Sequence, residues 1–306
     1  MQLVSIITVN FNQPQVTEAL FASIAAITIN IPVEVIVVDN GSKENHVPRW
    51  VIAYPEYTFI RSEKNLGFAG GNNIGIHAAK GDCLFLVNND TEFTQGLVEA
   101  LADTLDKHPA TAIVCPKIHY FTDKDVIQYA GFTKMNFFTC RNSCIGEHEK
   151  DNGQYNNASG PTAYAHGAAM MVRTSATAKA GLMAENFFLY YEEGDWCESF
   201  KRAGYTIEVN MQALIYHKES ISVGKNSLMK EYFMNRGRIL FIRRNATAFQ
   251  TFIFWIYFAL VVTPRNILAY KKNKQKGYAR ALKNAIWWNM THRVDSAELG
   301  WPFKNQ

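Results

Sequence analysis

The sequence predicts an α/β fold, with a doubly wound, mainly parallel sheet followed by a basic helical extension at the C-terminus. Two patterns predict it. Over the first 116 residues, apolar runs typical of buried parallel strands alternate with segments of helical periodicity. Polar clusters follow these apolar runs where strands are expected to end, and sheets of this kind bind ligands at the carboxyl ends of their strands.

In the first half of the chain, local sequence signals support each expected strand and helix. The apolar run at residues 3–9 is bounded by Asn and Pro, and Pro14 suits the first turn of a helix. In chain order we expect strands at residues 3–9, 33–38, 57–61, 83–87 and 112–116, with helices at 15–26, 69–79 and 95–107.

The second half is less regular. Residues 118–165 show no clear period, and a loop of that length is usually functional or disordered. Beyond it we expect a strand at 166–173, a helix at 192–203 and short strands at 205–210 and 213–217. A basic, mostly helical segment follows from about residue 221.

Charge is distributed unevenly along the chain. The formal net charge of +4 combines −7 over residues 1–229, +12 over residues 230–293 and −1 over residues 294–306. Such a split predicts an acidic globular body with a basic appendage that meets anions. It excludes a uniformly basic nucleic-acid binder, so we expect no nucleic-acid partner.

Five cysteines occur without a Cys-x-x-Cys pair, which disfavours a disulfide framework and fits a reduced, cytoplasmic protein. Cys140 and Cys144 lie four residues apart and do not form the usual Cys-x-x-Cys zinc spacing, so a zinc site is not favoured. The first residues carry no basic region typical of a signal peptide.

The most apolar window is residues 249–262, which is shorter than the roughly 20 residues that a membrane-spanning helix needs. Arginines precede the window, at positions 236, 238, 243 and 244, and further cations follow it. Cations flanking an apolar, aromatic helix predict peripheral, salt-sensitive binding to an anionic membrane surface, the inner face of the cell membrane, through residues 236–283. The alternative is a helix packed on the body with solvated Lys and Arg around it.

Two strand ends carry carboxylates. Asp39 follows a buried run and could accept the N3–H of a uracil base, while Asp90 ends the cluster Asn88-Asn89-Asp90. A divalent cation that bridges two phosphates needs only one or two protein carboxylates. The alternatives are turn or cap residues, which Asp and Asn commonly provide.

Six segments occur in an order that indicates a family resemblance: VSIITVNFN (4–12), VIVVDNGS (35–42), NLGFAGGNN (65–73), LVNNDTE (86–92), GAAMMVR (167–173) and FFLYYEEGDWC (187–197). Over about residues 3–220 the chain resembles family 2 glycosyltransferases of the GT-A fold, and especially their rhamnosyltransferase-like branch. The resemblance implies a nucleotide-sugar half at residues 1–92 and an acceptor half at 93–220, and the apolar and basic pattern beyond it predicts a membrane-associating tail at 221–306.

The resemblance further implies an inverting transfer of a sugar, rhamnose favoured, from a UDP- or dTDP-linked donor to a hydroxyl of a growing, lipid-linked glycan. Asp90 would hold Mg²⁺ or Mn²⁺, with His217 as a second ligand, although Asn88 replaces the first acid of the usual D-x-D-like motif. The implied donor-binding residues are Thr8, Phe11, Asn12, Asp39, Asn65, Asn72 and Asn89.

The cluster Glu192-Glu193-Gly194-Asp195 matches the acceptor-side acids of these enzymes. The resemblance gives Glu193 the role of general base, with Glu192 and Asp195 beside it, although the family usually has Asp at the position of Glu193. Three neighbouring carboxylates repel one another, which raises a pKa towards the useful range. The alternative is a helix N-terminus, where acids complement the helix dipole.

Two other functions stay open. A nucleotidyltransferase of sugar phosphates shares the layout but would release pyrophosphate, and it lacks the expected basic, glycine-rich first loop. The second is a catalytically inactive, glycan-binding scaffold, which stays open because Asn88 and Glu193 replace the residues usual in the family. The glycine-rich residues 67–73, expected to form a turn before a helix, match neither the Rossmann nor the P-loop spacing. His166 is a candidate for the acceptor side.

Overall fold

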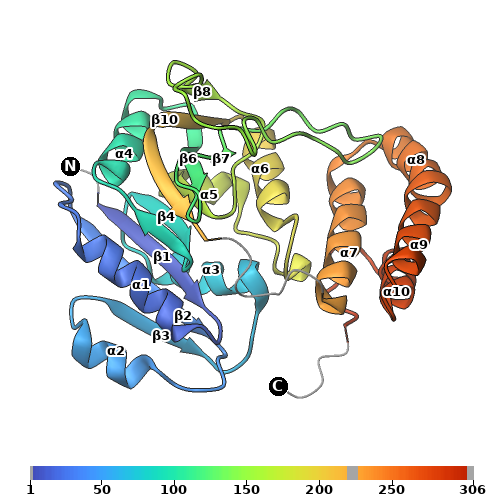
Figure 1. Ribbon diagram of the computed structural model, residues 1–306, viewed down its shortest axis with the longest axis horizontal. Helices are drawn as coiled ribbons and strands as arrows, with labels where there is room; N and C mark the ends of the chain where they lie inside the picture. The colour runs from blue at the N-terminus through green and yellow to red at the C-terminus, as the bar shows by residue number, and fades with distance from the viewer. Residues whose placement is uncertain (1–2, 219–226, 302–306) are drawn as a thin grey trace.

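The computed structural model describes residues 3–218 and 227–301, so residue 221, the expected start of the basic segment, lies outside the described part. Within it, ten strands form one sheet with the main order β3-β2-β1-β4-β9-β6-β10-β5 (Figure 1). The strands are β1 (Val4–Asn10), β2 (Val33–Asn40), β3 (Thr58–Ser62), β4 (Cys83–Asn88), β5 (Thr91–Phe93), β6 (Thr111–Tyr120), β7 (Ile127–Tyr129), β8 (Gly160–Pro161), β9 (Ala169–Arg173) and β10 (Thr206–His217).

The sheet is mainly parallel, as predicted. Strands β3, β2, β1 and β4 run parallel, and β6 runs parallel to β10. Strand β9 is antiparallel to both β4 and β6, and β5 is antiparallel to β10. The short strands β7 and β8 pair with β6 and β10. The carboxyl ends of β1, β2 and β4 therefore meet at one edge, which positions their polar residues together.

Helices pack against the sheet and extend beyond it (Figure 1). The body contains α1 (Pro14–Ala25), α2 (Val47–Ala53), α3 (Gly67–Ala78), α4 (Leu97–Lys107), α5 (Thr174–Ala180), the 3₁₀ turn η1 (Glu185–Phe187) and α6 (Glu192–Arg202). The C-terminal part contains α7 (Leu228–Asn245), α8 (Ala248–Tyr257), the π-helical η2 (Phe258–Val262), α9 (Thr263–Lys272) and α10 (Tyr278–Thr291). Helix α7 lies between the body and the outer helices.

Several local expectations need correction. Residues 67–73 are not a turn, because they form the first part of α3. Residues 206–217 form one strand with an irregularity between Asn210 and Leu214, rather than two strands. Helices α2 and α5 and strand β5 were not expected. The aperiodic stretch at 118–165 contains β7 and β8, whose three and two residues are too short to show a period.

The C-terminal apolar segment is longer than the 14-residue window. Helices α8, η2 and α9 form one continuous helical run, Ala248–Lys272, of 25 residues, long and apolar enough to cross a membrane by length and composition. Only 17% of its most apolar window is buried. Phe254, Phe258 and Val262, four residues apart, are buried on one side of it. The argument that this segment is too short to span a bilayer is therefore wrong.

Candidate active site

A cavity of about 430 Å³ lies at the carboxyl ends of β1, β2 and β4, closed by α3, the N-terminus of α6 and the end of β10. Among the expected site residues, its lining contains Phe11, Asn65, Asn72, Asn89, Asp90, Glu192, Glu193 and His217. Its volume is in the range of small-molecule sites. The fold thus brings donor-side and acceptor-side candidates into one cavity.

Asp90 and His217 face each other inside this cavity. Asp90 Oδ1 lies 3.2 Å from His217 Nε2, and both side chains are buried. The other ring nitrogen, Nδ1, is 2.8 Å from Gln128 Oε1, so a neutral ring that donates from Nδ1 to this acceptor presents the Nε2 lone pair towards Asp90. A buried amide on β7 therefore fixes the orientation of the histidine.

These two side chains fit a divalent cation. Asp90 Oδ1 is buried without a hydrogen-bond donor in the described part of the chain. A carboxylate oxygen beside an imidazole lone pair is a donor set suited to Mn²⁺ or Mg²⁺ when phosphates and water supply the remaining ligands. Within the described residues, no group of three His, Cys, Asp or Glu side chains gathers to form a metal site from protein ligands alone.

Glu192 and Glu193 stand at the start of α6. Glu192 is 3% exposed and its Oε2 has no hydrogen-bond partner among the described residues. Burial raises the pKa of Glu192 well above its ordinary value, and the neighbouring Glu193 raises it further. Burial also raises the pKa of Glu193, opposed by hydrogen bonds from backbone N–H groups. Carboxylates with raised pKa values are suited to accept a proton near neutral pH.

The backbone just before these acids is strained. Phe188, Tyr190 and Tyr191 have φ values of 66°, 69° and 75°, in the left-handed region that bulky residues rarely adopt. Backbone of this kind is concentrated at functional sites, where the surrounding structure holds it. On the other side of the chain, Gly67 approaches so closely that a Cβ there would lie 2.2 Å from Phe188 O. The glycine therefore permits contact between α3 and the acid-bearing segment.

The expected base-binding residue Asp39 is already paired. Its side chain is 1% exposed, Oδ1 accepts from Asn10 Nδ2 at 2.9 Å, and Oδ2 forms an ion pair with Arg61. Arg61 lies opposite Asp39 in the β2–β3 register. The neighbouring Asn40 lines the cavity and donates to Gly67 O at 2.9 Å, which fixes the loop leading into α3.

Four expected site residues do not line the cavity: Thr8, Asn12, Asp39 and Asp195. Asp195 is 2% exposed, and its Oδ1 accepts from Arg244 Nε at 2.9 Å and from Asn245 Nδ2 at 2.7 Å, so it connects α6 to α7. This corrects its assignment as a residue facing the acceptor. Thr8 Oγ1 is buried without a partner among the described groups.

Sequence reasoning missed Gln128, Asn40, Arg61 and Phe132. Arg61 was recoverable from strand pairing, because it lies in the expected strand 57–61, which pairs with the strand that carries Asp39. Gln128 and Phe132 lie in the aperiodic stretch, which carried no signal. The Phe132 ring stacks on His166 with an interplanar angle of 3°, and both residues line the cavity. Burial lowers the pKa of His166 to about 3, with a further contribution from His217, so this ring is neutral.

Comparison with known proteins agrees with this arrangement. The family model described as "Glycosyl transferase family 2" matches residues 5–179, more than half of the chain. The chain belongs to glycosyl transferase family 2. The family 2 match covers the strands β1, β2 and β4 and the helix α3, all of which line the cavity.

Two curated relatives and one solved structure illustrate the likeness. The family 2 chain is 27% identical over 207 residues to the low-salt glycan biosynthesis hexosyltransferase Agl10 of Haloferax volcanii, which covers 66% of this chain and 63% of that protein. It is 23% identical over 244 residues to an N-acetylglucosaminyl-diphospho-decaprenol L-rhamnosyltransferase of Mycobacterium tuberculosis, covering 72% and 78%. A crystal structure of GalNAc-T7 with UDP, GalNAc and Mn²⁺ superposes with a TM-score of 0.66 at 13% identity, covering 95% and 56%. The structural likeness establishes the GT-A fold.

Proposed function

We propose that this family 2 chain transfers a sugar from a UDP- or dTDP-linked donor to a hydroxyl of a glycan acceptor, with inversion at the sugar carbon. The observation that carries the proposal is a single cavity in which Glu192 and Glu193 line one part and Asp90 with His217 line another. Direct displacement needs a base at the acceptor and charge stabilisation at the leaving diphosphate.

Each residue has a proposed role. Glu193 accepts the acceptor hydroxyl proton, because its pKa is raised and it lines the cavity. Asp90 and His217 hold Mg²⁺ or Mn²⁺, which when bound neutralises charge developing on the leaving nucleoside diphosphate. The GalNAc-T7 structure, which contains UDP and Mn²⁺, supports both the donor class and the metal.

The donor side is proposed to hold the nucleoside. Phe11, Asn65, Asn72 and Asn89 line the cavity and supply an aromatic face and amide groups. Asp39 remains the proposed acceptor for a base N3–H, because a carboxylate paired with Arg61 and Asn10 still has unused lone pairs. Thr8 and Asn12 belong to this side as supports of the β1 end.

Rhamnose and a lipid-linked acceptor are the finer parts of the proposal. Their support is the mycobacterial relative, whose name gives L-rhamnose as the transferred sugar and a diphospho-decaprenol lipid as the acceptor carrier. A lipid-linked acceptor presents its hydroxyl at a membrane surface. Residues 1–220 would form the transferase domain and 221–306 the membrane-associating tail.

The tail also has a surface suited to a membrane. Large apolar side chains project outwards from Ala248–Lys272 and from α10. They are Phe249, Phe252, Ile256, Leu260, Val261, Leu268, Trp287 and Met290, each at least 42% exposed. Exposed cations adjoin them: Arg265, Lys271, Lys272, Lys274, Lys276, Arg280 and Lys283.

We propose that this face docks peripherally on the anionic inner leaflet. The opposite side of Ala248–Lys272, with Phe254, Phe258 and Val262, is buried in the protein, so the helix has only one face left for lipid. The α7 arginines are excluded from the docking face: Arg236 is fully buried, and Arg238, Arg243 and Arg244 donate hydrogen bonds within the protein. The predicted surface of residues 236–283 is corrected to begin at α8.

A nucleotide-sugar panel tests the catalytic proposal. UDP- and dTDP-linked sugars should raise the unfolding temperature in the presence of Mn²⁺, because a ligand at 100 times its Kd adds about 2.7 kcal/mol to the free energy of unfolding. Turnover should release UDP or dTDP, not pyrophosphate. Absence of stabilisation by every nucleotide sugar would contradict the proposal.

Vesicle flotation tests the docking face. The full chain should float with phosphatidylglycerol–phosphatidylcholine vesicles at low salt and less at high salt. The variant Phe252→Ser/Leu260→Ser should bind at least tenfold more weakly, since each buried apolar side chain contributes about 1.5–3 kcal/mol. Ile52, 83% exposed on α2, provides the matched control, and Ile52→Ser should float as the wild type does. Equal flotation of all three proteins would refute the assignment of this face.

A further inference from the structure

A second cavity, separate from the one described above, lies among α7, α9, α10 and the start of α6. Its volume is about 300 Å³. Its lining consists of Tyr191, Ser227, Lys230, Glu231, Met234, Asn235, Arg238, Asn266, Gln275 and Tyr278. Nothing in the proposed sugar transfer uses these residues, and Lys230 and Arg238 give one side of the cavity a positive charge.

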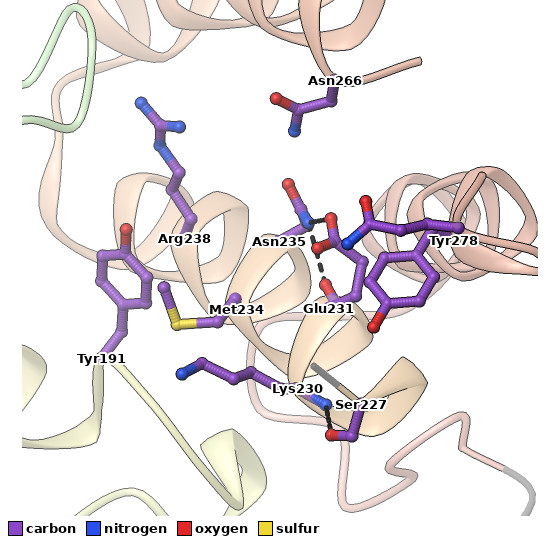
Figure 2. A pocket seen from close by; sticks show the side chains of 10 residues that line it. Tyr191, Ser227, Lys230, Glu231, Met234, Asn235, Arg238, Asn266 and Tyr278 are labelled. Carbon is purple, nitrogen blue, oxygen red and sulfur yellow. Dashed lines mark hydrogen bonds between the residues drawn. The ribbon is translucent and has the colours of Figure 1, made fainter. Parts of the chain in front are cut away.

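The charges inside this cavity are separated. Figure 2 shows Lys230 and Arg238 on the side of Tyr191, with Glu231 nearer to Tyr278. Glu231 Oε1 is engaged, because it accepts from Asn235 Nδ2 at 2.5 Å and from the hydroxyl of Tyr270. The acid is therefore held by neutral donors and leaves the two cations available to a ligand.

Within the described residues, the side chains of the two cations contact neutral groups. Arg238 donates to Thr139 O and lies over the Phe258 ring at 5.9 Å, while its Nε is buried without a partner among those residues. Lys230 Nζ lies 5.9 Å from the Tyr190 ring centroid. A desolvated cation with an unused donor is stabilised by an anion, and phosphate oxygens accept from Arg and Lys in strong, charge-assisted hydrogen bonds.

The cavity also adjoins both the acid site and the apolar docking face. Tyr190 and Met229 line the first cavity, whereas their neighbours Tyr191 and Lys230 line the second, so the two cavities share a wall. Asn266 belongs to α9, which carries the exposed Leu268. A ligand whose anionic group links a sugar to an apolar chain matches this arrangement. Its sugar would face the acid site, its anionic group would lie in the second cavity and its chain would contact the apolar docking face.

We propose that this second cavity binds the phosphate or diphosphate of a lipid-linked acceptor through Lys230 and Arg238. This inference rests on the proposed sugar transfer and names the part of the acceptor that the second cavity recognises. The acceptor sugar would extend past Tyr190 and Tyr191 towards Glu193, while the lipid chain would lie along the apolar face of α8–α9.

The test uses farnesyl diphosphate as the probe, with the full chain saturated by UDP and Mg²⁺ so that the nucleotide site is filled. We expect binding by calorimetry, about tenfold weaker in Lys230→Gln and weaker still in Lys230→Gln/Arg238→Gln, since each charge-assisted contact is worth about tenfold or more. Lys80→Gln/Lys179→Gln removes two exposed cations of the body, which line neither cavity nor the proposed docking face, and should keep wild-type affinity.

Three results would overturn the proposal: no farnesyl diphosphate binding to the UDP-loaded protein, equal affinity in Lys230→Gln, or an equal loss in the Lys80→Gln/Lys179→Gln control. Among the described residues, the Lys230 side chain makes no hydrogen bond, so Lys230→Gln tests the site without removing a structural contact. Substituting Arg238 also removes its hydrogen bond to Thr139 O. Inorganic pyrophosphate is the second arm. If it competes as well as farnesyl diphosphate, the anion site is supported but its lipid assignment is overturned. Failure of UDP to bind would refute the proposed function instead.

Discussion

Replacing Gln128 with leucine tests how His217 is held. The Nδ1–Oε1 hydrogen bond of 2.8 Å is buried at both ends, with Gln128 5% and His217 7% exposed. Leucine leaves the ring N–H without an acceptor, which costs about 1–3 kcal/mol in a buried site. It also allows the other tautomer, which places a proton on the nitrogen that faces Asp90. Outer partners of metal-binding histidines change affinity by about 10–100-fold, so we expect Mn²⁺ binding to weaken by that factor.

The assay is a Mn²⁺ titration in the presence of UDP, followed by the electron paramagnetic resonance signal of free Mn²⁺. Gln128→Glu keeps an acceptor and adds a charge, so it should bind Mn²⁺ at least as tightly as the wild type. Gln212→Leu changes an exposed glutamine and controls for the substitution itself. Wild-type affinity in Gln128→Leu, or an equal loss in the Leu and Glu variants, would refute the reasoning.

Further substitutions separate the other roles. Asp90→Ala should abolish metal-dependent nucleotide binding, measured by thermal shift with and without chelator, while the fold persists. Glu193→Gln should lower kcat by about 10² or more with little change in donor affinity, and the raised pKa of Glu193 predicts that wild-type kcat falls, as pH decreases, already above the ordinary Glu value of 4.5. Glu192→Gln should raise the unfolding temperature at pH 8 but not at pH 4, because a buried acid with a raised pKa destabilises the fold only when ionised. Asp39→Asn should weaken UDP binding more than turnover, and equal inhibition by CDP and UDP in the wild type would contradict its placement at the base.

The sheet was predictable because its strands are buried on both faces. Residues 33–40 and 83–88 are almost entirely apolar until a polar residue marks the strand end, and such runs are typical of strands in a parallel sheet. Helix α3 was placed too late because glycine and asparagine have low helix propensity. Its glycines are required by packing instead: a Cβ at Gly71 would lie 2.8 Å from Val9 Cγ1. Tertiary contact, which local propensity does not contain, decided that boundary.

The candidate site was predictable where residues follow strands and not where they depend on long-range packing. Asp90 and His217 were placed by motif, and they meet because β5 pairs with β10. Asp195 shares a motif with Glu193, but helical geometry turns it towards α7, where Arg244 binds it. The identity of a carboxylate's partner 49 residues away is not encoded in the spacing of the motif.

Helix α7 joins the proposed catalytic and membrane functions physically. The Arg236 guanidinium is fully buried, lies 3.7 Å from the Trp288 ring centroid and donates to Asn186 O at 2.7 Å, just before the strained segment. A Cβ at Gly237 would lie 2.6 Å from Tyr190 O, so α7 contacts that segment directly.

From the opposite side, Phe68 N donates to Phe188 O at 2.7 Å. The left-handed residues before Glu192 are thus held between α3, which lines the first cavity, and α7, which carries the outer helices. Because strained backbone persists only where its surroundings over-determine it, loss of α7 should release the acids from their position. Arg236 and Arg244 connect α7 to the body, and the proposed lipid-docking surface begins only at α8.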